Sequence, residues 1–432
     1  MTSLAPRSRT MVLTLLRFVI DLSPAAASID GDVFPMLLGR FNVIDLPESE
    51  DLVLLRRQAQ ELMRSFPVEY WRDKDRNREF PKDYFEAAAK QGFFGITVPE
   101  EYGGLGMGME AACAVMNEVA RQGGGLPAGD IMMRELVFGG LAISRFGTKG
   151  VKEKYLPALV EGKVLMAIAH TEPNAGVNTF AIETRALRKD GGFSVRGQKV
   201  WITLGHMADL VLLIARTTPT DPSQPKAHGL TVMLLETKEN NVRAFPIRGM
   251  SMRPLTSTQF YIEDAWVPEE NVLGEVDRGW EVLKHVFNAE RLSTSSIAVG
   301  CGEYALSAAV RYAKERIVFG RPIGSNQGIQ FPLAQAYAEL YAAKLMTQYA
   351  ARLFDSGKEC AVEANAASLL SARAAFVAAD RAVQTYGGMG FAEDNDLERF
   401  FRDVRLFKTG PVPEEMVLNF LATRGLGLPR SF

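Results

Sequence analysis

The residues with the clearest chemical potential lie between Ile168 and Thr203. An apolar run ends at His170 and breaks into a loop of small and polar residues, Thr171 to Val177. Two alternating segments follow, and the second ends in Trp201-Ile202-Thr203. If the loop and this strand end lie side by side, they present hydroxyls, main-chain N–H groups and an indole face. Such groups suit a ligand that is flat and has polar edges.

Two segments with strand periodicity must carry this loop and its neighbouring strand end. Apolar and polar residues alternate over Ile182 to Arg188 and over Phe193 to Thr203. Asp190-Gly191-Gly192 joins the two segments, and glycine accepts the positive φ angle that a tight hairpin turn requires. The sequence therefore predicts a β-hairpin whose second strand ends at Thr203.

The surrounding chain divides into three predicted domains. Residues 46–163 have helical periodicity, whereas residues 164–276 contain alternating segments rich in Val, Leu and Phe, separated by Gly, Pro and Asp. Residues 277–432 contain long, alanine-rich segments with apolar stripes, at Trp280 to Glu315, Gln327 to Phe354 and Ala361 to Tyr386. This order predicts an α+β fold with a helical domain, a central β domain and a C-terminal helical bundle.

Charge and composition narrow the possible functions. The 432-residue chain has a net charge of −2, which argues against binding nucleic acid or inserting into an acidic membrane. The three cysteines form no CxxC pair and predict reduced thiols in a reducing, cytoplasmic compartment. The four histidines show no ligand spacing, so no metal site is expected.

The first 45 residues differ in character from the rest. Three arginines precede Asp21, and Arg17 splits the apolar run from Met11 to Ile20. A targeting segment is one interpretation. A poorly ordered extension, or a start codon placed upstream of the working protein, is the other, and we favour it. The apolar run is too short to span a membrane.

Six short motifs occur in order along the chain: ITVPEEYGG (96–104), TEPNAG (171–176), GQKVWIT (197–203), ER (290–291), RIVFG (316–320) and QTYGGMGF (384–391). Through them the chain resembles the acyl-CoA dehydrogenase family of flavoproteins, from about residue 48 to residue 428. The resemblance implies a C-terminal four-helix bundle and a bound FAD between this bundle and the central β-sheet or barrel domain.

The resemblance assigns the flavin half of FAD to the first set of residues. The Thr171 hydroxyl and neighbouring N–H groups would bond the pyrimidine edge, Trp201 would cover one face of the ring, and Thr203 would lie beside N5. The whole set is His170, Thr171, Gly176, Val177, Trp201 and Thr203. Residue types alone would instead suggest a core tryptophan and a turn threonine.

The same resemblance assigns the pyrophosphate and adenine of FAD to a second set, which would act across a subunit interface. These residues are Arg316, Phe319, Gln327, Gln384, Gly387 and Gly388. A guanidinium can bind phosphate through two hydrogen bonds, and glycine lets the main chain approach a ligand closely. The assignment implies a homo-oligomer, most simply a dimer of dimers.

The catalytic base departs from the commonest family pattern. Many members carry it in a Tyr-Glu-Gly-Thr motif near the C-terminus, and Pro411 falls at the place of that glutamate. A minority, including isovaleryl- and long-chain-type enzymes, places the glutamate on a bundle helix before an arginine. Glu290 stands there, so it is the expected base, with Asn288 and Arg291 at the substrate. The alternative for Glu290-Arg291 is an ordinary solvated ion pair.

Two further departures concern the substrate. Proline has no N–H, so Pro411 would remove one of the two hydrogen-bond donors that polarise the thioester in the family. An alignment shifted by one residue would place Gly410 there instead, and the sequence leaves both alternatives open. Val177 replaces a serine that contacts the substrate in many relatives.

The resemblance implies FAD-dependent α,β-dehydrogenation of an acyl-CoA thioester, with hydride transfer to flavin N5 and an electron-transfer flavoprotein as acceptor. The departures at Pro411 and Val177 leave two alternatives. One is an oxidase or monooxygenase of the same fold that acts on a substrate without CoA. The other is a flavin-binding member with a non-catalytic role.

Overall fold

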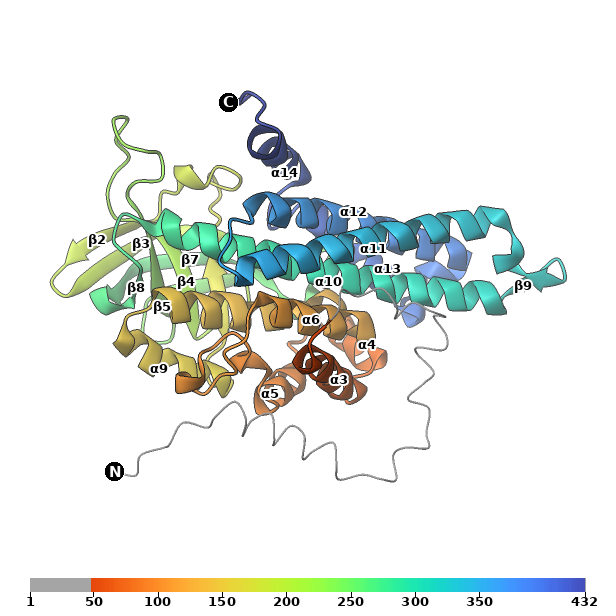
Figure 1. The fold of residues 1–432 in the computed structure, drawn as a ribbon. Coiled ribbons are helices and arrows are strands. Elements are labelled where there is room, and N and C mark those ends of the chain that lie inside the picture. Colours follow the sequence, from red (N-terminus) through yellow and green to blue (C-terminus); the bar gives the residue numbers. More distant parts are fainter. Residues whose placement is uncertain (1–47, 432) are drawn as a thin grey trace.

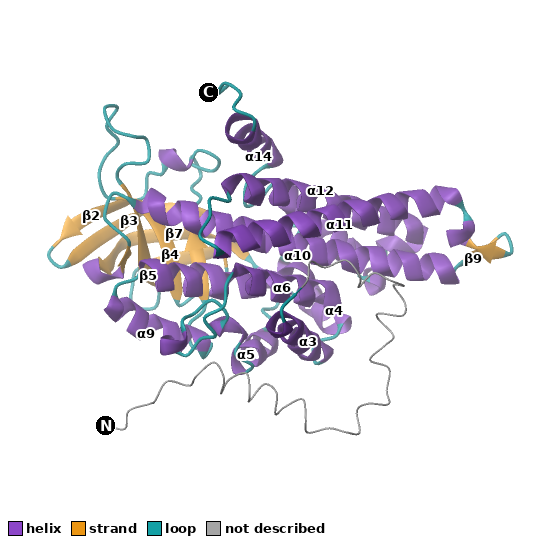
Figure 2. Ribbon diagram, viewed as in Figure 1, coloured by secondary structure: helices purple, strands orange, loops and turns teal. Residues whose placement is uncertain are grey.

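The computed structural model describes residues 48–431, and the predicted N-terminal extension therefore lies outside the described residues. The described chain forms a helical layer, a β domain and a long helical bundle (Figure 1). The three regions follow one another in sequence. In Figure 2 the strands of the β domain gather at one end of the molecule, and one small further hairpin lies at the opposite end of the helical bundle. The predicted α+β architecture is confirmed.

The N-terminal helical region packs beneath the bundle. Its α-helices are α3 (Glu50–Arg64), α4 (Val68–Asn77), α5 (Lys82–Lys90), α6 (Met109–Val119), α7 (Gly125–Met133), α8 (Ala142–Phe146) and α9 (Lys149–Val160). Hydroxyl caps start two of them. Ser49 accepts a hydrogen bond from the Leu52 N–H, and Thr148 accepts one from the Val151 N–H. Each cap satisfies a helix N–H that has no partner within the helix.

One helix boundary in this region differs from the sequence pattern. The pattern indicates a helix beginning at Met132, but α7 begins at Gly125 and continues through a π-helical turn, Arg134–Leu141, into α8. Pro127 lies in the first turn of α7, where a missing N–H costs little. The glycines in this segment are typical of a loop, and here close packing with other helices requires them.

The β domain is one twisted, mostly antiparallel sheet. Its strands are β1 (Met166–Ala169), β2 (Arg185–Lys189), β3 (Gly192–Thr203), β4 (Leu210–Arg216), β5 (Leu230–Glu236), β6 (Val242–Ile247), β7 (Ser257–Pro268) and β8 (Val272–Leu273). The strand order is β6-β7-β3-β2-β4-β5-β8, and β1 pairs in parallel with β4. The predicted hairpin is confirmed: Lys189 pairs with Gly192, and Gly191 has a φ of 80°.

Strand β4 connects the sheet to the helices. Leu210, Leu212 and Ile214 pack into the large helical core, whereas Val211, Leu213 and Ala215 pack into the separate core of the β domain. Alternate residues of a strand point to opposite faces, so a strand buried on both sides must be apolar throughout. The LVLLIA run of β4 satisfies this requirement and fixes the sheet against the bundle.

The bundle contains α10 (Gly279–Glu315), α11 (Gln327–Asp355), α12 (Ala361–Tyr386), α13 (Leu397–Val404) and α14 (Glu414–Phe420). Helix α10 begins beside the β domain and runs to the far end of the bundle (Figure 1). There a small hairpin of β9 (Ile317–Val318) and β10 (Arg321–Pro322) connects it to α11. Small residues permit close packing: a Cβ on Gly302 would lie 2.5 Å from the Leu340 side chain.

Three sequence expectations concern the cysteines, a metal site and a membrane-spanning helix. Cys113, Cys301 and Cys360 are free and buried. Within residues 48–431, no cluster of three His, Cys, Asp or Glu side chains has the arrangement of a metal site. None of the described helices combines the length and apolar character needed to cross a bilayer. The cytoplasmic location stays a prediction.

Candidate functional site

The Thr171 loop and the end of β3 lie side by side, as the sequence suggested. The Val200 N–H donates to the Thr171 carbonyl at 2.9 Å. Beneath this contact, the buried Lys199 ammonium donates to Glu172 Oε1 at 2.9 Å, to the His170 carbonyl at 3.1 Å and to the Ile214 carbonyl at 2.7 Å. One lysine therefore ties the loop to the sheet.

Glu172 completes this lock from the loop side. Its carboxylate accepts the N–H groups of Glu183 and Thr184 at 2.7 and 2.9 Å, in addition to Lys199. Neither Lys199 nor Glu172 was singled out from the sequence. The sequence offered little signal, because β3 also contains Ser194, Arg196 and Gln198, and nothing in its pattern shows that Lys199 is the buried cation that needs a buried partner.

Trp201 has a positive backbone φ angle, and its side chain is largely exposed to solvent. Its φ angle is 62°, and its side chain is 59% exposed. It lies where the β3–β7 register shifts, between Val200 and Ile202, and such a bulge re-aims a side chain out of the regular pattern. A strained backbone and an exposed indole ring both fail to stabilise the folded chain, so this conformation of Trp201 has no structural benefit within the chain. The arrangement is typical of an aromatic residue that covers a ligand.

Thr203 ends β3 in a buried, polar environment. Its Oγ1 lies 3.2 Å from Ser257 Oγ, and its carbonyl accepts a hydrogen bond from Arg134 Nη1 at 3.4 Å. His170 lies across from this strand end, with Nε2 3.1 Å from Thr179 Oγ1. Burial, with the nearby Lys199 charge, lowers the pKa of His170 to about 4. The imidazole is therefore uncharged at neutral pH.

Glu290 lies on the stretch of α10 next to the β domain. The ring of Phe287, one turn before it, contacts the His170 ring at a centroid distance of 5.2 Å. Burial raises the pKa of Glu290 to about 7, against the opposing charges of Arg291 and Arg134. The side chain still reaches solvent in part, and among residues 48–431 its carboxylate has no hydrogen bond or ion pair.

Arg291 does not neutralise Glu290 through a direct ion pair. Its Nη1 donates to the Phe287 carbonyl at 3.0 Å, and its buried Nε has no partner in the described chain. Burial lowers the pKa of Arg291 despite the nearby Glu290 charge. Asn288 is half-buried on the same helix, whereas Gly176 and Val177 lie exposed on the loop. The pair is thus unlike a solvated surface ion pair.

The loop before α14 contains no alternative base. Residues 409–413 include no acid, and Pro411 is exposed. The Gly410 N–H donates to the Leu406 carbonyl at 2.8 Å, so it is already occupied. Glu414 follows, with Oε1 2.5 Å from Arg373 Nε and Oε2 3.3 Å from Lys408 Nζ. Burial would raise the pKa of Glu414, but Arg373 and Lys408 lower it below its ordinary value.

The second predicted set gathers at the far end of the bundle. Tyr312 of α10 stacks on Tyr386 of α12 at 4.1 Å, which brings the two helix ends together. The set lies at these ends, on the hairpin and at the start of α11, and all its members are exposed: Arg316, Phe319, Gln327, Gln384, Gly387 and Gly388. Phe319 is fully exposed and has a φ of 52°.

The two sets do not meet within one chain. Glu290 and Arg316 are 26 residues apart on one continuous helix, which corresponds to about 39 Å. A single dinucleotide does not bridge that separation. If both sets bind one cofactor, they must therefore belong to different subunits.

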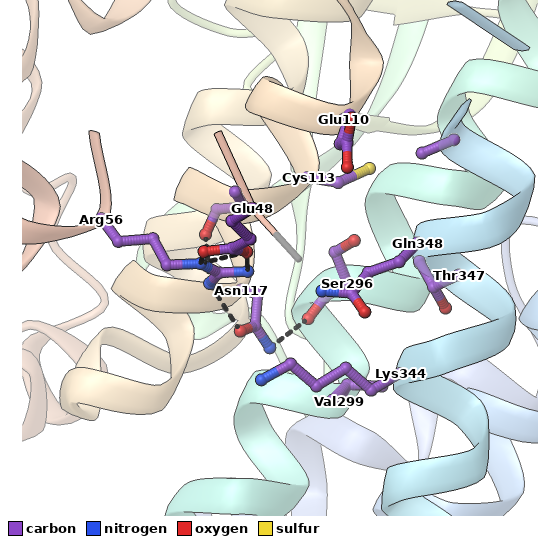
Figure 3. A pocket seen from close by; sticks show the side chains of 12 residues that line it. Glu48, Arg56, Glu110, Cys113, Asn117, Ser296, Val299, Lys344, Thr347 and Gln348 are labelled. Carbon is purple, nitrogen blue, oxygen red and sulfur yellow. Dashed lines mark hydrogen bonds and ion pairs between the residues drawn. The ribbon is translucent and has the colours of Figure 1, made fainter. Parts of the chain in front are cut away.

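A small cavity lies between α3, α6, α10 and α11 (Figure 3), and none of its lining residues belongs to either set. It is lined by polar groups that largely satisfy one another: Arg56 Nη1 donates to Asn117 Oδ1 at 3.3 Å, and Asn117 Nδ2 donates to the Ser296 carbonyl at 3.3 Å. We assign it no ligand, because polar gaps of this kind are typically filled by buried water.

Comparison with known proteins gives a consistent result. Sequence models of the acyl-CoA dehydrogenase N-terminal, middle and C-terminal domains match residues 49–163, 167–265 and 277–426. Acyl-CoA dehydrogenase FadE12 of Mycobacterium tuberculosis H37Rv is 36% identical over 387 residues, which cover 89% of this chain and 98% of that protein.

Two further similarities agree. Mitochondrial isovaleryl-CoA dehydrogenase of Solanum tuberosum is 35% identical over 354 residues, covering 79% of this chain and 82% of that protein. The structure of butyryl-CoA dehydrogenase from Megasphaera elsdenii superimposes with a TM-score of 0.83 at 27% identity, covering 89% of this chain and all of that one.

Members of this family use FAD, and the residues present fit it. The exposed, strained Trp201 offers an uncovered indole face, and the locked Thr171 loop and Thr203 offer polar groups at its sides. The match over three domains, the fold and this fit lead to one conclusion. The chain belongs to the acyl-CoA dehydrogenase family of FAD-dependent oxidoreductases.

Proposed function

We propose that this protein α,β-dehydrogenates an acyl-CoA thioester and that Glu290 removes the α-proton. One observation carries the proposal: Glu290 is a carboxylate without a hydrogen bond or ion pair in the described chain, and burial raises its pKa to about 7. A carboxylate in water is too weak a base for a thioester α-proton, and desolvation strengthens it.

The neighbouring residues would divide the remaining work. When bound, FAD supplies the hydride acceptor at N5. Trp201 would stack against the ring, Thr171 would bond its polar edge, and Thr203 would hold a hydroxyl beside it. Asn288, Arg291 and Val177 would line the path of the thioester. Trp201 and Thr203 lie on β3, and Asn288 and Arg291 lie on α10.

Polarisation of the thioester is the weak point of the proposed site. Pro411 has no N–H, and the Gly410 N–H is occupied by Leu406. Neither alignment considered from the sequence therefore leaves a free donor. Loss of one such donor typically slows acyl chemistry by about 10²–10³-fold. A strengthened base at Glu290 would offset part of this loss.

We also propose that the protein works as a homo-oligomer, with a dimer of dimers as the expected form. The separation of about 39 Å along α10 supports this proposal. The flavin half of each FAD would bind the first set of one chain, and its pyrophosphate and adenine would bind the second set of another chain. The fully exposed Phe319 would be covered by the partner subunit. An electron-transfer flavoprotein is the expected electron acceptor.

The function is tested by anaerobic titration of the FAD-loaded protein with a panel of straight-chain, branched and aromatic acyl-CoAs. We expect the visible flavin absorbance to bleach with one class, which also identifies the substrate group. A protein that stays yellow with every acyl-CoA would contradict the proposal.

The oxidase alternative remains a second candidate because of the missing donor at Pro411 and Gly410. An oxidase would consume oxygen and release peroxide without another electron acceptor. We expect neither at a rate that matches acyl-CoA-dependent bleaching. Fast peroxide release with a substrate that lacks CoA would favour the oxidase.

A further inference from the structure

A buried ion pair lies beside Glu290, and neither of its residues was singled out from the sequence. Arg134 Nε donates to Asp130 Oδ2 at 2.6 Å, and Nη2 reaches Oδ1 at 3.4 Å. Both residues are 4% exposed. They lie where α7 passes into the π-helical turn Arg134–Leu141, and such turns are frequent at functional sites.

Close packing of α7 on α10 brings this pair to the site. Gly129 precedes Asp130, and a Cβ on Gly129 would lie 2.5 Å from the Ile297 side chain of α10. Only a glycine fits at this approach. Ile297 follows Glu290 by seven residues, about two helical turns, so both lie on one face of α10. Helix α7, which carries Asp130, therefore packs on the side of α10 that also carries the proposed base.

Arg134 also contacts the β domain. Its Nη1 donates to the Thr203 carbonyl at 3.4 Å, and the Thr203 hydroxyl lies beside Ser257. The Arg134 guanidinium thus bonds both Asp130 of α7 and the end of β3. Its charge also lowers the pKa of Glu290.

The charges that face Glu290 come from three elements. Arg291 on α10 and Arg134 on the π-helical turn favour the carboxylate form, whereas Asp130 on α7 disfavours it. Of the two partners, Arg134 acts the more strongly on Glu290. From the β domain, His170 lies close through Phe287 but is uncharged at neutral pH.

We propose that Asp130 and Arg134 are positioning residues for the base: they tie the end of β3 to α7, which packs on α10, and they place a nearly neutral pair of opposite charges in the surroundings of Glu290. This inference rests on the proposed role of Glu290. A lone arginine would make Glu290 a weaker base, and a lone aspartate would keep it protonated. The pair avoids both outcomes.

The pair can be tested because its two halves have opposite effects. In Asp130→Asn, the uncompensated Arg134 should lower the midpoint pH of acyl-CoA-dependent flavin reduction. In Arg134→Gln, the remaining Asp130 should raise it. Arg134→Lys retains the charge and should stay near the wild-type midpoint. A shift of one pH unit changes the rate about tenfold at a pH well below the midpoint.

A second readout needs no substrate. Infrared spectroscopy can follow the carboxyl band of protonated Glu290 through a pH titration, with Glu290→Gln identifying the band by its loss. The band should titrate at lower pH in Asp130→Asn and at higher pH in Arg134→Gln. This readout keeps the inference testable if no acyl-CoA reduces the flavin, which would overturn only the proposed function.

A matched control breaks another buried pair. Asp396 and Arg399 are both 2% exposed and lie 3.3 Å apart; Asp396 also pairs with Arg72 at 2.5 Å, so its substitution removes at least as much buried ion pairing as Asp130→Asn. Asp396 is not among the charges that act on Glu290. Asp396→Asn should lower the melting temperature without moving the Glu290 band. If Asp130→Asn and Arg134→Gln behave like this control, the pair is structural only and the inference is overturned. Shifts in opposite directions support it.

Discussion

Two exposed aromatic residues have positive φ angles, one on strand β3 of the β domain and one on the hairpin that follows α10. Trp201 at the β-domain end and Phe319 at the hairpin end have φ angles of 62° and 52°. Their supports differ. Trp201 projects from a strand locked by Lys199 and by the long β3–β7 ladder, whereas Phe319 sits on a short hairpin with its side chain fully exposed. In the proposed function, the half of the site at Trp201 is formed within one chain, and the half at Phe319 is completed by a second chain.

The largest expected effect comes from removing the lock under the β-domain end. Lys199→Met would leave the Glu172 carboxylate buried without its cation, which typically costs about 3–5 kcal/mol. We expect a lower free energy of unfolding by urea and a loss of bound FAD. Arg196→Met breaks an exposed ion pair with Asp264 and serves as the control, with an expected change below about 1 kcal/mol.

A smaller effect should separate ligand binding from stability at the same end. Trp201→Gly relieves the positive φ, so the unfolding free energy of the FAD-free protein should stay the same or rise. Loss of an aromatic stacking surface should weaken FAD binding by about 1–3 kcal/mol. Isothermal titration of the FAD-free protein with FAD measures this difference. A variant with unchanged FAD affinity would remove Trp201 from the flavin site.

At the hairpin end, the expected effect depends on protein concentration. Phe319→Ser removes an exposed side chain and should leave the stability of the single chain unchanged. The oligomer should dissociate at a higher protein concentration than in wild type, and FAD should be lost with it. Light scattering coupled to size exclusion, with absorbance of bound flavin, follows both. An unaffected assembly would show that Phe319 is not at the interface.

A further effect, which is seen only as a pH dependence, concerns Glu135 on the π-helical turn. Burial raises its pKa to about 8, although the Met166 N–H donates to its carboxylate at 3.0 Å. A carboxyl group with a raised folded-state pKa favours folding at low pH, and this contribution is lost as the pH rises through about 8. Glu135→Gln should therefore flatten the decline of melting temperature between pH 5 and about 8. An unchanged decline would exclude Glu135 as its source.

Local pattern was sufficient to predict most long elements. Helix α12 spans Ala361–Tyr386 as expected, and the hairpin turn forms at Asp190 and Gly191. These elements follow from apolar periodicity and turn chemistry, which neighbouring residues determine. The start of α7 was missed because its glycines are explained only by packing, as Gly129 against Ile297 shows.

The candidate site was predicted unevenly for the same reason. Glu290, Trp201 and Thr203 are found through motifs that are contiguous in sequence. Lys199 and Glu172 act through a contact between separate segments, and so does Arg134 where it donates to the Thr203 carbonyl. The Asp130–Arg134 pair itself is local, but only the folded chain shows that it is buried. The occupied Gly410 N–H was missed for a different reason: its acceptor, the Leu406 carbonyl, is only four residues away, and no turn was predicted at this position after α13.

The most direct test of the central claim is the pH dependence of flavin reduction by the acyl-CoA that bleaches the wild-type protein. A carboxyl group with a pKa of about 7 is protonated below that pH and cannot accept the α-proton. We predict a rate that rises with pH to a plateau, with its midpoint near pH 7. Glu290→Gln should slow reduction by about 10²–10⁴-fold and remove this pH dependence. A wild-type rate in Glu290→Gln, with the same midpoint, would show that another group is the base.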